Sequence, residues 1–262
     1  MKIDLEGKVA LITASSQGIG FAIAKAIHRS GARVCICARD SQRLERAARE
    51  LGSPDQVLGL PGDIAYPVFL PRLVESCNTH FGGSIDILVN NSGGPPAGEA
   101  LRMTEEQWAG AINANLLSVV RLCALVVPGM KEKGWGRIIN LTSTAAREPA
   151  AGMVLSNVTR AGVAAYSKTL SQEVGPFGIT VNTILTGGCL TDRLTSLLKR
   201  EIETSGGSIE DRLKKIEQSI PVRHIATPDE FAQVVVLLAS PEAGYLTGAA
   251  IPLDGGVSKS IF

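Results

Sequence analysis

Short apolar runs alternate with longer amphipathic segments along almost the whole chain. Apolar runs of this length are typical of strands buried on both faces of a sheet, and they occur at 9–13, 33–38, 57–60, 85–90, 137–142, 179–185 and 250–253. Helical patterns separate them at 18–30, 42–51, 67–81, 105–131, 155–174 and 228–239. Alternating strands and helices predict right-handed βαβ units and a parallel sheet. We therefore expect a single α/β domain over residues 1–262, with helices on both faces of a doubly wound sheet.

One segment, residues 190–223, departs from this alternation. It is polar and helical in pattern, and Ser-Gly-Gly-Ser interrupts it at 205–208. Excursions of this kind usually lie over a site rather than inside the core. The pattern therefore predicts a lid.

The composition is typical of a globular protein and argues against several functions. Of the 262 residues, 45% are hydrophobic and 19% are charged, and the net charge is +1. Basic and acidic residues are interleaved, so we expect neither nucleic acid nor a membrane as a partner. No continuous apolar run approaches the roughly 18 residues of a membrane span. Residues 1–8 lead straight into the first strand without the pattern of a secretory signal.

The cysteines do not indicate a metal site. They are five in number and irregularly placed, and Cys35 and Cys37 share one face of a predicted strand. No further ligands lie nearby at a suitable spacing. We therefore expect no metal, buried free thiols and a cytoplasmic location.

A glycine-bearing turn joins the first strand to the first helix. It reads Thr-Ala-Ser-Ser-Gln-Gly-Ile-Gly at 13–20. Glycines in such a turn let backbone N–H groups approach a pyrophosphate at the helix N-terminus, and the strand–turn–helix context supports this interpretation over a merely structural turn. We therefore predict a Rossmann-type dinucleotide site. The turn would contribute Thr13, Ser15, Ser16, Gln17, Gly18, Ile19 and Gly20 to it.

Further motifs give the chain a resemblance to the short-chain dehydrogenase/reductase family from about residue 7 to residue 256. The family motif Thr-Gly-x-x-x-Gly-x-Gly is matched except that Ala14 replaces its first glycine. Asn-Asn-Ser-Gly at 90–93 resembles the family's Asn-Asn-Ala-Gly, and residues 241–256 resemble its C-terminal pattern. The resemblance implies a nicotinamide cofactor. It also implies that this cofactor contacts Asp63, Ile64, Asn90, Ser92, Gly93, Gly187 and Thr191.

The end of the second strand bears on the choice between NAD and NADP. An acid there would bind the ribose 2′-hydroxyl, whereas a basic residue accepts a 2′-phosphate. In the family the discriminating acid aligns with Ala38, and the planar donor fork of Arg39 suits a phosphate. We predict NADP as the preferred cofactor, with NAD as the alternative. Asp40 is interpreted as a helix cap.

Two residues of the family's catalytic set are present and two are replaced. In the family an asparagine, a serine, a tyrosine and a lysine act together. Asn115 and Ser143 match the first two, and the tyrosine and lysine positions fall on Ser156 and Arg160. Their i, i+4 spacing keeps these two on one helical face. Arg160 is also expected to bind the cofactor ribose. Loss of a positioned general acid typically costs on the order of 10²–10⁴ in rate.

The sequence leaves the proton source and the activity open. Glu148 would be an alternative acid if it were desolvated, while Tyr166 fits a core position better. One hypothesis is an NADP-dependent oxidoreductase that acts on a small-molecule carbonyl or alcohol, resembling the 3-oxoacyl-carrier-protein reductases. The other is a nucleotide-binding sensor or scaffold without catalysis. The family resemblance also implies a homotetramer built from the helices that contain 116–127 and 161–170.

Overall fold

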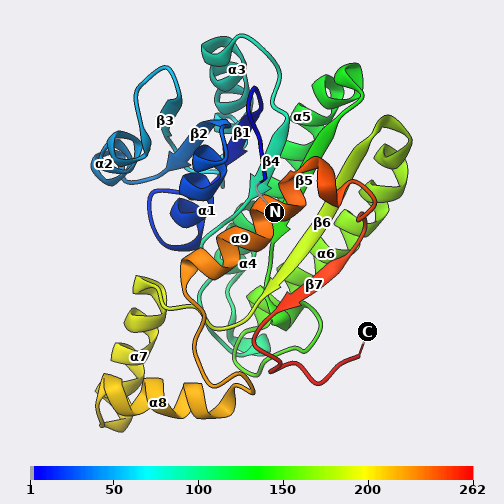
Figure 1. Ribbon diagram of the computed structural model, residues 1–262. Helices are drawn as coiled ribbons and strands as arrows, with labels where there is room; N and C mark the ends of the chain where they lie inside the picture. The colour runs from blue at the N-terminus through cyan, green and yellow to red at the C-terminus, as the bar shows by residue number, and fades with distance from the viewer. Residues whose placement is uncertain (1–2, 262) are drawn as a thin grey trace.

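Seven parallel strands form the centre of the computed structural model, which describes residues 3–261 (Figure 1). They stand in the order β3-β2-β1-β4-β5-β6-β7. Their bounds are β1 Val9–Ile12, β2 Arg33–Ala38, β3 Val57–Pro61, β4 Ile87–Asn90, β5 Gly136–Leu141, β6 Ile179–Thr186 and β7 Ala250–Leu253. Every predicted strand is present, and the predicted Rossmann-type fold is confirmed.

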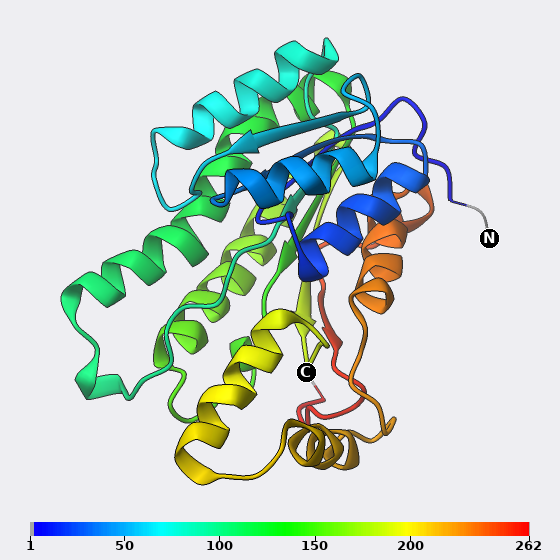
Figure 2. The ribbon, with the colours of Figure 1, turned by 90° about the vertical axis from the view of Figure 1, so that its left-hand side faces the viewer.

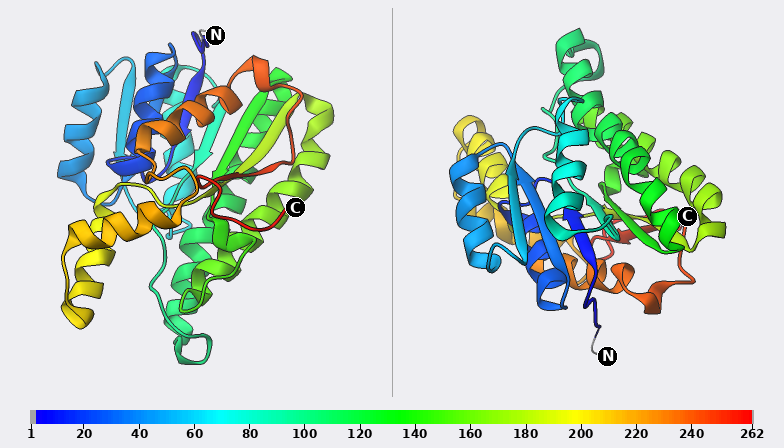
Figure 3. Two further views of the ribbon diagram at one scale, coloured as in Figure 1. Left: turned by 60° about the horizontal axis from the view of Figure 1, so that its bottom comes forward. Right: turned by 90° about the horizontal axis from the view of Figure 1, so that it is seen from above.

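Helices cover both faces of the sheet (Figures 1 and 3). Their bounds are α1 Gly18–Arg29, α2 Ser41–Leu51, α3 Phe69–Phe81, α4 Glu105–Ile112, α5 Ser118–Lys133, α6 Val154–Val174, α7 Asp192–Ser205, α8 Ile209–Ser219 and α9 Pro228–Ala239. Helices α1, α2 and α9 build one core, and α3, α5 and α6 build the other. Alternate residues of β1 enter the two cores, with Ile12 in the first and Leu11 in the second. A strand buried on both faces must be apolar throughout, which explains the continuous runs in the sequence.

The order of the strands reverses at the centre of the sheet. β2 and β3 lie on one side of β1, and β4 to β7 lie on the other. The connections that leave β1 and β4 therefore run in opposite directions. A crevice opens between them, outside the carboxyl ends of these strands.

The helix predicted at 105–131 changes its winding midway. α4 passes through a π-helical turn at Asn113–Leu117 into α5, and such turns are frequent at functional sites. Within Glu105–Lys133 one 18-residue window has a mean hydropathy of 1.8, so the helix could cross a membrane by length and composition alone. The helix packs on α3, α6 and the sheet, although only 39% of that window is buried.

Residues 190–223 contain α7 and α8, which extend beyond the carboxyl ends of the strands (Figure 2). The two helices are joined at 206–208 and stand apart from the rest of the helical layers. They thus border the crevice. That they act as a lid stays a prediction.

Gly20 marks a close approach between α1 and the loops that follow β1 and β4. A Cβ added there would lie 2.5 Å from the Ala14 carbonyl oxygen and 2.6 Å from Asn91 Nδ2. We expect Gly20→Ala to lower the free energy of unfolding by about 1–3 kcal/mol, because an added methyl group overpacks this position. Urea unfolding measures the loss. Gly175→Ala is the matched control, because nothing lies within 4 Å of its added Cβ. Equal losses in the two variants would contradict the packing argument.

Candidate functional site

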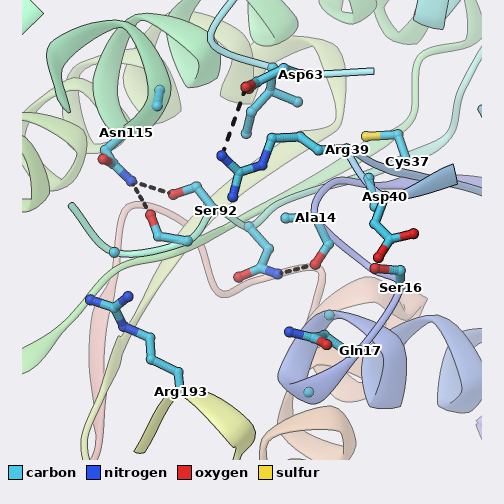
Figure 4. A pocket seen from close by; sticks show the side chains of 18 of the residues that line it. Ala14, Ser16, Gln17, Cys37, Arg39, Asp40, Asp63, Ser92, Asn115 and Arg193 are labelled. Atoms are coloured by element: carbon cyan, nitrogen blue, oxygen red, sulfur yellow. Dashed lines mark hydrogen bonds and ion pairs between the residues drawn. The ribbon is translucent and has the colours of Figure 1, made fainter. Parts of the chain in front are cut away.

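A cleft of about 580 Å³ occupies the crevice where the strand order reverses (Figure 4). One wall is the turn that opens α1. The other walls come from the loops after β2, β3 and β4, the π-helical turn and the start of α7. Loops from several strands therefore meet at one concave surface, as is usual for ligand sites in open α/β sheets.

The turn at 13–20 exposes the N-terminus of α1 to the cleft. Gly18 has a φ of +58°, and no acidic side chain lies in the first turn of the helix. Free N–H groups and the helix dipole favour an anion here. Ala14 also has a positive φ, 48°, a conformation that costs a residue with a Cβ roughly 1–2 kcal/mol. Ala14 thus adopts the conformation of the family's glycine at a small cost in conformational energy.

Hydrogen bonds tie this turn to the loop after β4. Thr13 Oγ1 donates to the Asn91 carbonyl at 2.6 Å and accepts from the Asn91 N–H at 2.9 Å. Asn91 Nδ2 donates to the Ala14 carbonyl at 3.0 Å. The two sides of the crevice are therefore held at a fixed separation.

Three residues predicted to contact a cofactor lie beneath the cleft instead of lining it. Thr13 is 1% exposed, and its hydroxyl is hydrogen-bonded to the backbone of Asn91. Ser15 is fully buried, with its hydroxyl donating to the Ile12 carbonyl at 2.6 Å. Asn90 Nδ2 donates to Asn140 Oδ1 at 2.7 Å within the sheet. These side chains support the site, whereas Ser16, Gln17, Gly18, Ile19 and Gly20 line it.

Arg39 and Asp63 stand together at the ends of β2 and β3 (Figure 4). Their ion pair is long, 4.0 Å between Nη1 and Oδ2, and the Arg39 side chain is 81% exposed. Asp40 does not compete for Arg39, because it caps α2 by accepting from the Arg43 N–H at 2.9 Å. That bond lowers the pKa of the Asp40 carboxyl. Arg39 is therefore available to a ligand, and Ile64 also lines the cleft.

A second cavity of about 310 Å³ adjoins the cleft. Ser143, Ser156, Arg160, Gly187 and Thr191 all line it. The residues that line both spaces are Ile19, Asn91, Ser92, Gly94, Thr191 and Arg193. The cleft and this second cavity therefore adjoin along these residues. The structure brings three of the four predicted catalytic residues to the second cavity, which is called the catalytic cavity below.

Asn115, the fourth predicted catalytic residue, positions the loop after β4 that borders both spaces. It lies in the π-helical turn and is 2% exposed. Its Nδ2 donates to Ser92 Oγ at 2.8 Å and to the Gly93 carbonyl at 2.7 Å. In this structure Asn115 fixes the loop after β4 and lines the cleft, not the catalytic cavity.

Arg160 joins the ends of two neighbouring strands. Its Nη1 donates to the Leu141 carbonyl at 2.9 Å and its Nη2 to the Ser92 carbonyl at 3.4 Å. The side chain is buried, and its Nε finds no acceptor among the described residues. Burial, and to a lesser extent the charge of Arg193, lower the pKa of Arg160 to about 10. The guanidinium stays protonated at neutral pH.

The tyrosines of the chain lie outside the catalytic cavity. Tyr66 and Tyr245 are exposed on the surface. Tyr166 packs in the second core, where burial raises the pKa of its hydroxyl. Glu148, the alternative acid, does not line the cavity either. Its Oε1 accepts hydrogen bonds from the backbone N–H groups of Lys259 and Ser260. Within residues 3–261, the hydroxyls that line the cavity come from serine and threonine.

Two residues that the sequence reasoning did not single out are central to the site. Asn91 lines both spaces and ties the loops together. Arg193 projects from the start of α7 (Figure 4), and its Nη2 donates to the Pro95 carbonyl at 3.4 Å. Their roles depend on partners 77 and 98 residues away. The motif at 90–93 includes Asn91 but does not reveal this contact, and no local pattern marks Arg193.

Comparison with known proteins agrees with this geometry. A family model described as enoyl-(acyl carrier protein) reductase matches residues 13–258. The 3-oxoacyl-[acyl-carrier-protein] reductase FabG of Vibrio cholerae is 35% identical over 255 residues, covering 97% of this chain and 99% of the relative. The structure of L-sorbose reductase from Gluconobacter frateurii, complexed with NADPH and L-sorbose, is 36% identical, covers 100% of both chains and has a TM-score of 0.94. An actinorhodin polyketide ketoreductase with NADPH is 30% identical, covers 97% of this chain and 98% of that one, and has a TM-score of 0.91.

The fold, the glycine turn and the cleft at the strand reversal define a dinucleotide-binding α/β oxidoreductase. Within that class, the chain belongs to the short-chain dehydrogenase/reductase family.

Proposed function

We propose that this protein reduces the carbonyl group of a small molecule with NADPH, and that it catalyses the reverse oxidation of the alcohol. The observation that carries the proposal is that the two spaces share a boundary. A cleft with an open helix N-terminus adjoins a cavity lined by Ser143, Ser156 and Arg160. A substrate in the cavity would therefore meet the end of a dinucleotide bound in the cleft.

The residues of the cleft fit NADPH. The N–H groups at the start of α1 suit its pyrophosphate, and Arg39 suits its 2′-phosphate. Asn115 fixes Ser92, which lines both the cleft and the cavity, and Gly93, which lines the cleft. When bound, NADPH supplies a hydride to the carbonyl carbon and becomes NADP⁺, while the carbonyl oxygen gains a proton.

Ser143 and Arg160 act on the carbonyl oxygen. Ser143 Oγ accepts from the Ala145 N–H at 3.2 Å, which leaves its own proton for the substrate. The Arg160 guanidinium forms no ion pair within residues 3–261, so its charge stabilises the negative charge that develops on that oxygen. Because the side chain of Ser156 is short, it leaves room for water, and we propose that solvent delivers the proton.

The sensor or scaffold hypothesis differs from this proposal in one observable. A sensor would bind NADPH without reducing any carbonyl compound. The retained hydroxyl of Ser143 lies in the cavity beyond the nucleotide cleft and is unnecessary for nucleotide binding alone. It favours the enzyme.

We further propose that the protein is a cytoplasmic homotetramer. Only 39% of the apolar window within Glu105–Lys133 is buried in one chain. Leu125 on α5 is 36% exposed, and Val158 on α6 is 49% exposed. Packing these helices against a second copy would remove that apolar surface from water. The five cysteines are buried and unpaired, as suits a reducing compartment.

The cofactor preference is tested at Arg39. We expect Arg39→Ala to weaken NADPH binding roughly 10–100-fold, since a hydrogen-bonded charge pair contributes about 1.5–3 kcal/mol. NADH affinity should change little. Fluorescence titration measures both affinities, and Arg46→Ala on the exposed side of α2 is the control. Equal affinity of the unaltered protein for NADH and NADPH would contradict the assignment.

The proton step is tested by restoring the phenol. Ser156→Tyr should raise kcat by at least about 10-fold, because it supplies the positioned acid whose loss costs on the order of 10²–10⁴. Steady-state rates with a carbonyl panel measure the gain. Adding Ser143→Ala should lower kcat in both backgrounds. The proposal would be wrong if Ser156→Tyr bound NADPH normally and gained no rate.

The assembly is tested by light scattering. We expect a mass four times the 27.5 kDa of one chain. Leu125→Glu should shift the protein to smaller species, because it places a charge in the proposed contact. Val68→Glu, at a site 85% exposed outside these helices, should leave the mass unchanged. A monomer for the unaltered chain would refute the tetramer.

A further inference from the structure

The catalytic cavity is positively charged. Two arginines, Arg160 and Arg193, line it, and none of the lining side chains is a carboxylate. The cofactor cleft differs, since Asp40, Asp63 and Asp192 are part of its walls. Arg193 is exposed, whereas Arg160 is buried. Because buried cations are ordinarily paired, this cavity favours a negatively charged occupant.

Arg160 retains an unused hydrogen-bond donor. The side chain is 7% exposed, and its Nε has no acceptor within residues 3–261. Its two backbone contacts are to neutral carbonyl groups. The charge of Arg193 adds repulsion, which contributes to the lowered pKa of Arg160. An anion in the cavity would relieve that repulsion.

Arg193 reaches from α7 across to the loop after β4. Its only hydrogen bond within the described residues is the 3.4 Å contact to the Pro95 carbonyl. A Cβ on Gly94 would lie 2.6 Å from Arg193 Nη2, so the glycine permits this approach. The guanidinium therefore stands at the junction of cleft and cavity without a charged partner.

The pyrophosphate of the cofactor is a second anion that Arg193 could contact. The expected pyrophosphate position is the N-terminus of α1. Thr191 is the residue of this segment next to it, because a Cβ on Gly18 would lie 3.5 Å from Thr191 Cγ2. Arg193 instead packs against Gly94 and Pro95. Its position favours the substrate over the pyrophosphate.

The remaining walls limit the size and character of the occupant. Met153, Leu194 and Leu197 supply apolar surface, and the cavity measures about 310 Å³. This volume suits a short acyl chain that ends in an anionic group.

We propose that the substrate is a short oxo acid whose carboxylate binds Arg193, with Arg160 adding positive charge. The chain of the acid lies against Met153, Leu194 and Leu197. This inference rests on the proposed carbonyl reduction. It makes Arg193 a determinant of specificity.

The test compares acids with their esters. A panel of 2-oxo and 3-oxo carboxylates, each paired with its methyl ester, is assayed with the full chain and NADPH, and L-sorbose serves as a neutral sugar. We expect the acids to exceed their esters in kcat/KM. Arg193→Gln should lower kcat/KM for acids by about 10–100-fold through KM, as loss of a charged hydrogen bond does. Values for esters and the NADPH affinity should stay within about 2-fold.

Lys199→Gln is the matched control, since it removes one exposed positive charge from α7 outside the cavity. It should preserve the preference for acids. Arg193→Lys should retain part of the preference for acids, because lysine keeps the positive charge but lacks the planar donor fork of the guanidinium. Titration calorimetry of the NADP⁺-loaded protein with the same acids and esters gives an answer even where turnover is too slow to follow.

The outcomes separate the two proposals. Reduction of esters and L-sorbose as efficiently as acids, unaffected by Arg193→Gln, would overturn the oxo-acid inference alone. A higher NADPH dissociation constant in Arg193→Gln, with acids and esters losing equally, would assign Arg193 to the cofactor and also overturn it. Acid binding without reduction of any carbonyl would refute the proposed function and leave the anion site standing. Absence of both binding and turnover would refute both.

Discussion

The hydrogen bonds between Thr13 and Asn91 are the interaction on which the site depends. They join the loops after β1 and β4 at the point where the strand order reverses. Thr13 is 1% exposed, so water cannot readily replace these bonds, and breaking one would leave a buried polar group unpaired. Ser92, Gly93 and Gly94 follow Asn91 directly. The hydrogen bonds of Asn91 therefore set the position of these residues, which form part of the boundary between the cleft and the catalytic cavity.

Arg160 extends the same set of ties from β4 to β5. Its two carbonyl partners give it a geometric role that is independent of any acid or base. This explains how the cavity keeps its shape although a serine stands where the family places its tyrosine. The cost is an uncompensated positive charge. Arg193 increases that cost, and a negatively charged substrate would offset it. In the mechanism that we propose, Ser156 and the two arginines form one altered centre, in which positive charge and water replace the function of a phenol.

The sequence predicted the fold well because the signals that define it are local. Continuous apolar runs are required of strands covered on both faces, and every one of them became a strand of the sheet. The grouping of Ser156 with Arg160 was also predictable, since i, i+4 spacing fixes a helical face. Ser143 joined them because it follows β5, whose end Arg160 contacts.

Other parts of the site depended on distant partners that no local pattern reveals. Asn90 ends β4, and its side chain enters the sheet toward Asn140 rather than the cleft. Glu148 is held by backbone N–H groups 111 and 112 residues away, so it does not reach the cavity. Arg193 belongs to a segment whose pattern indicated only an excursion. Its position against Gly94 is set by how α7 folds back over the crevice.

The central claim is that this altered centre still transfers hydride. Its most direct test is a single-turnover reaction with NADPH deuterated at C4 and a panel of oxo acids, ketoses and 3-oxoacyl thioesters, analysed by mass spectrometry. The account predicts a product alcohol that carries deuterium at the former carbonyl carbon. NADPH that binds stoichiometrically but passes no deuterium to any of these compounds would contradict it.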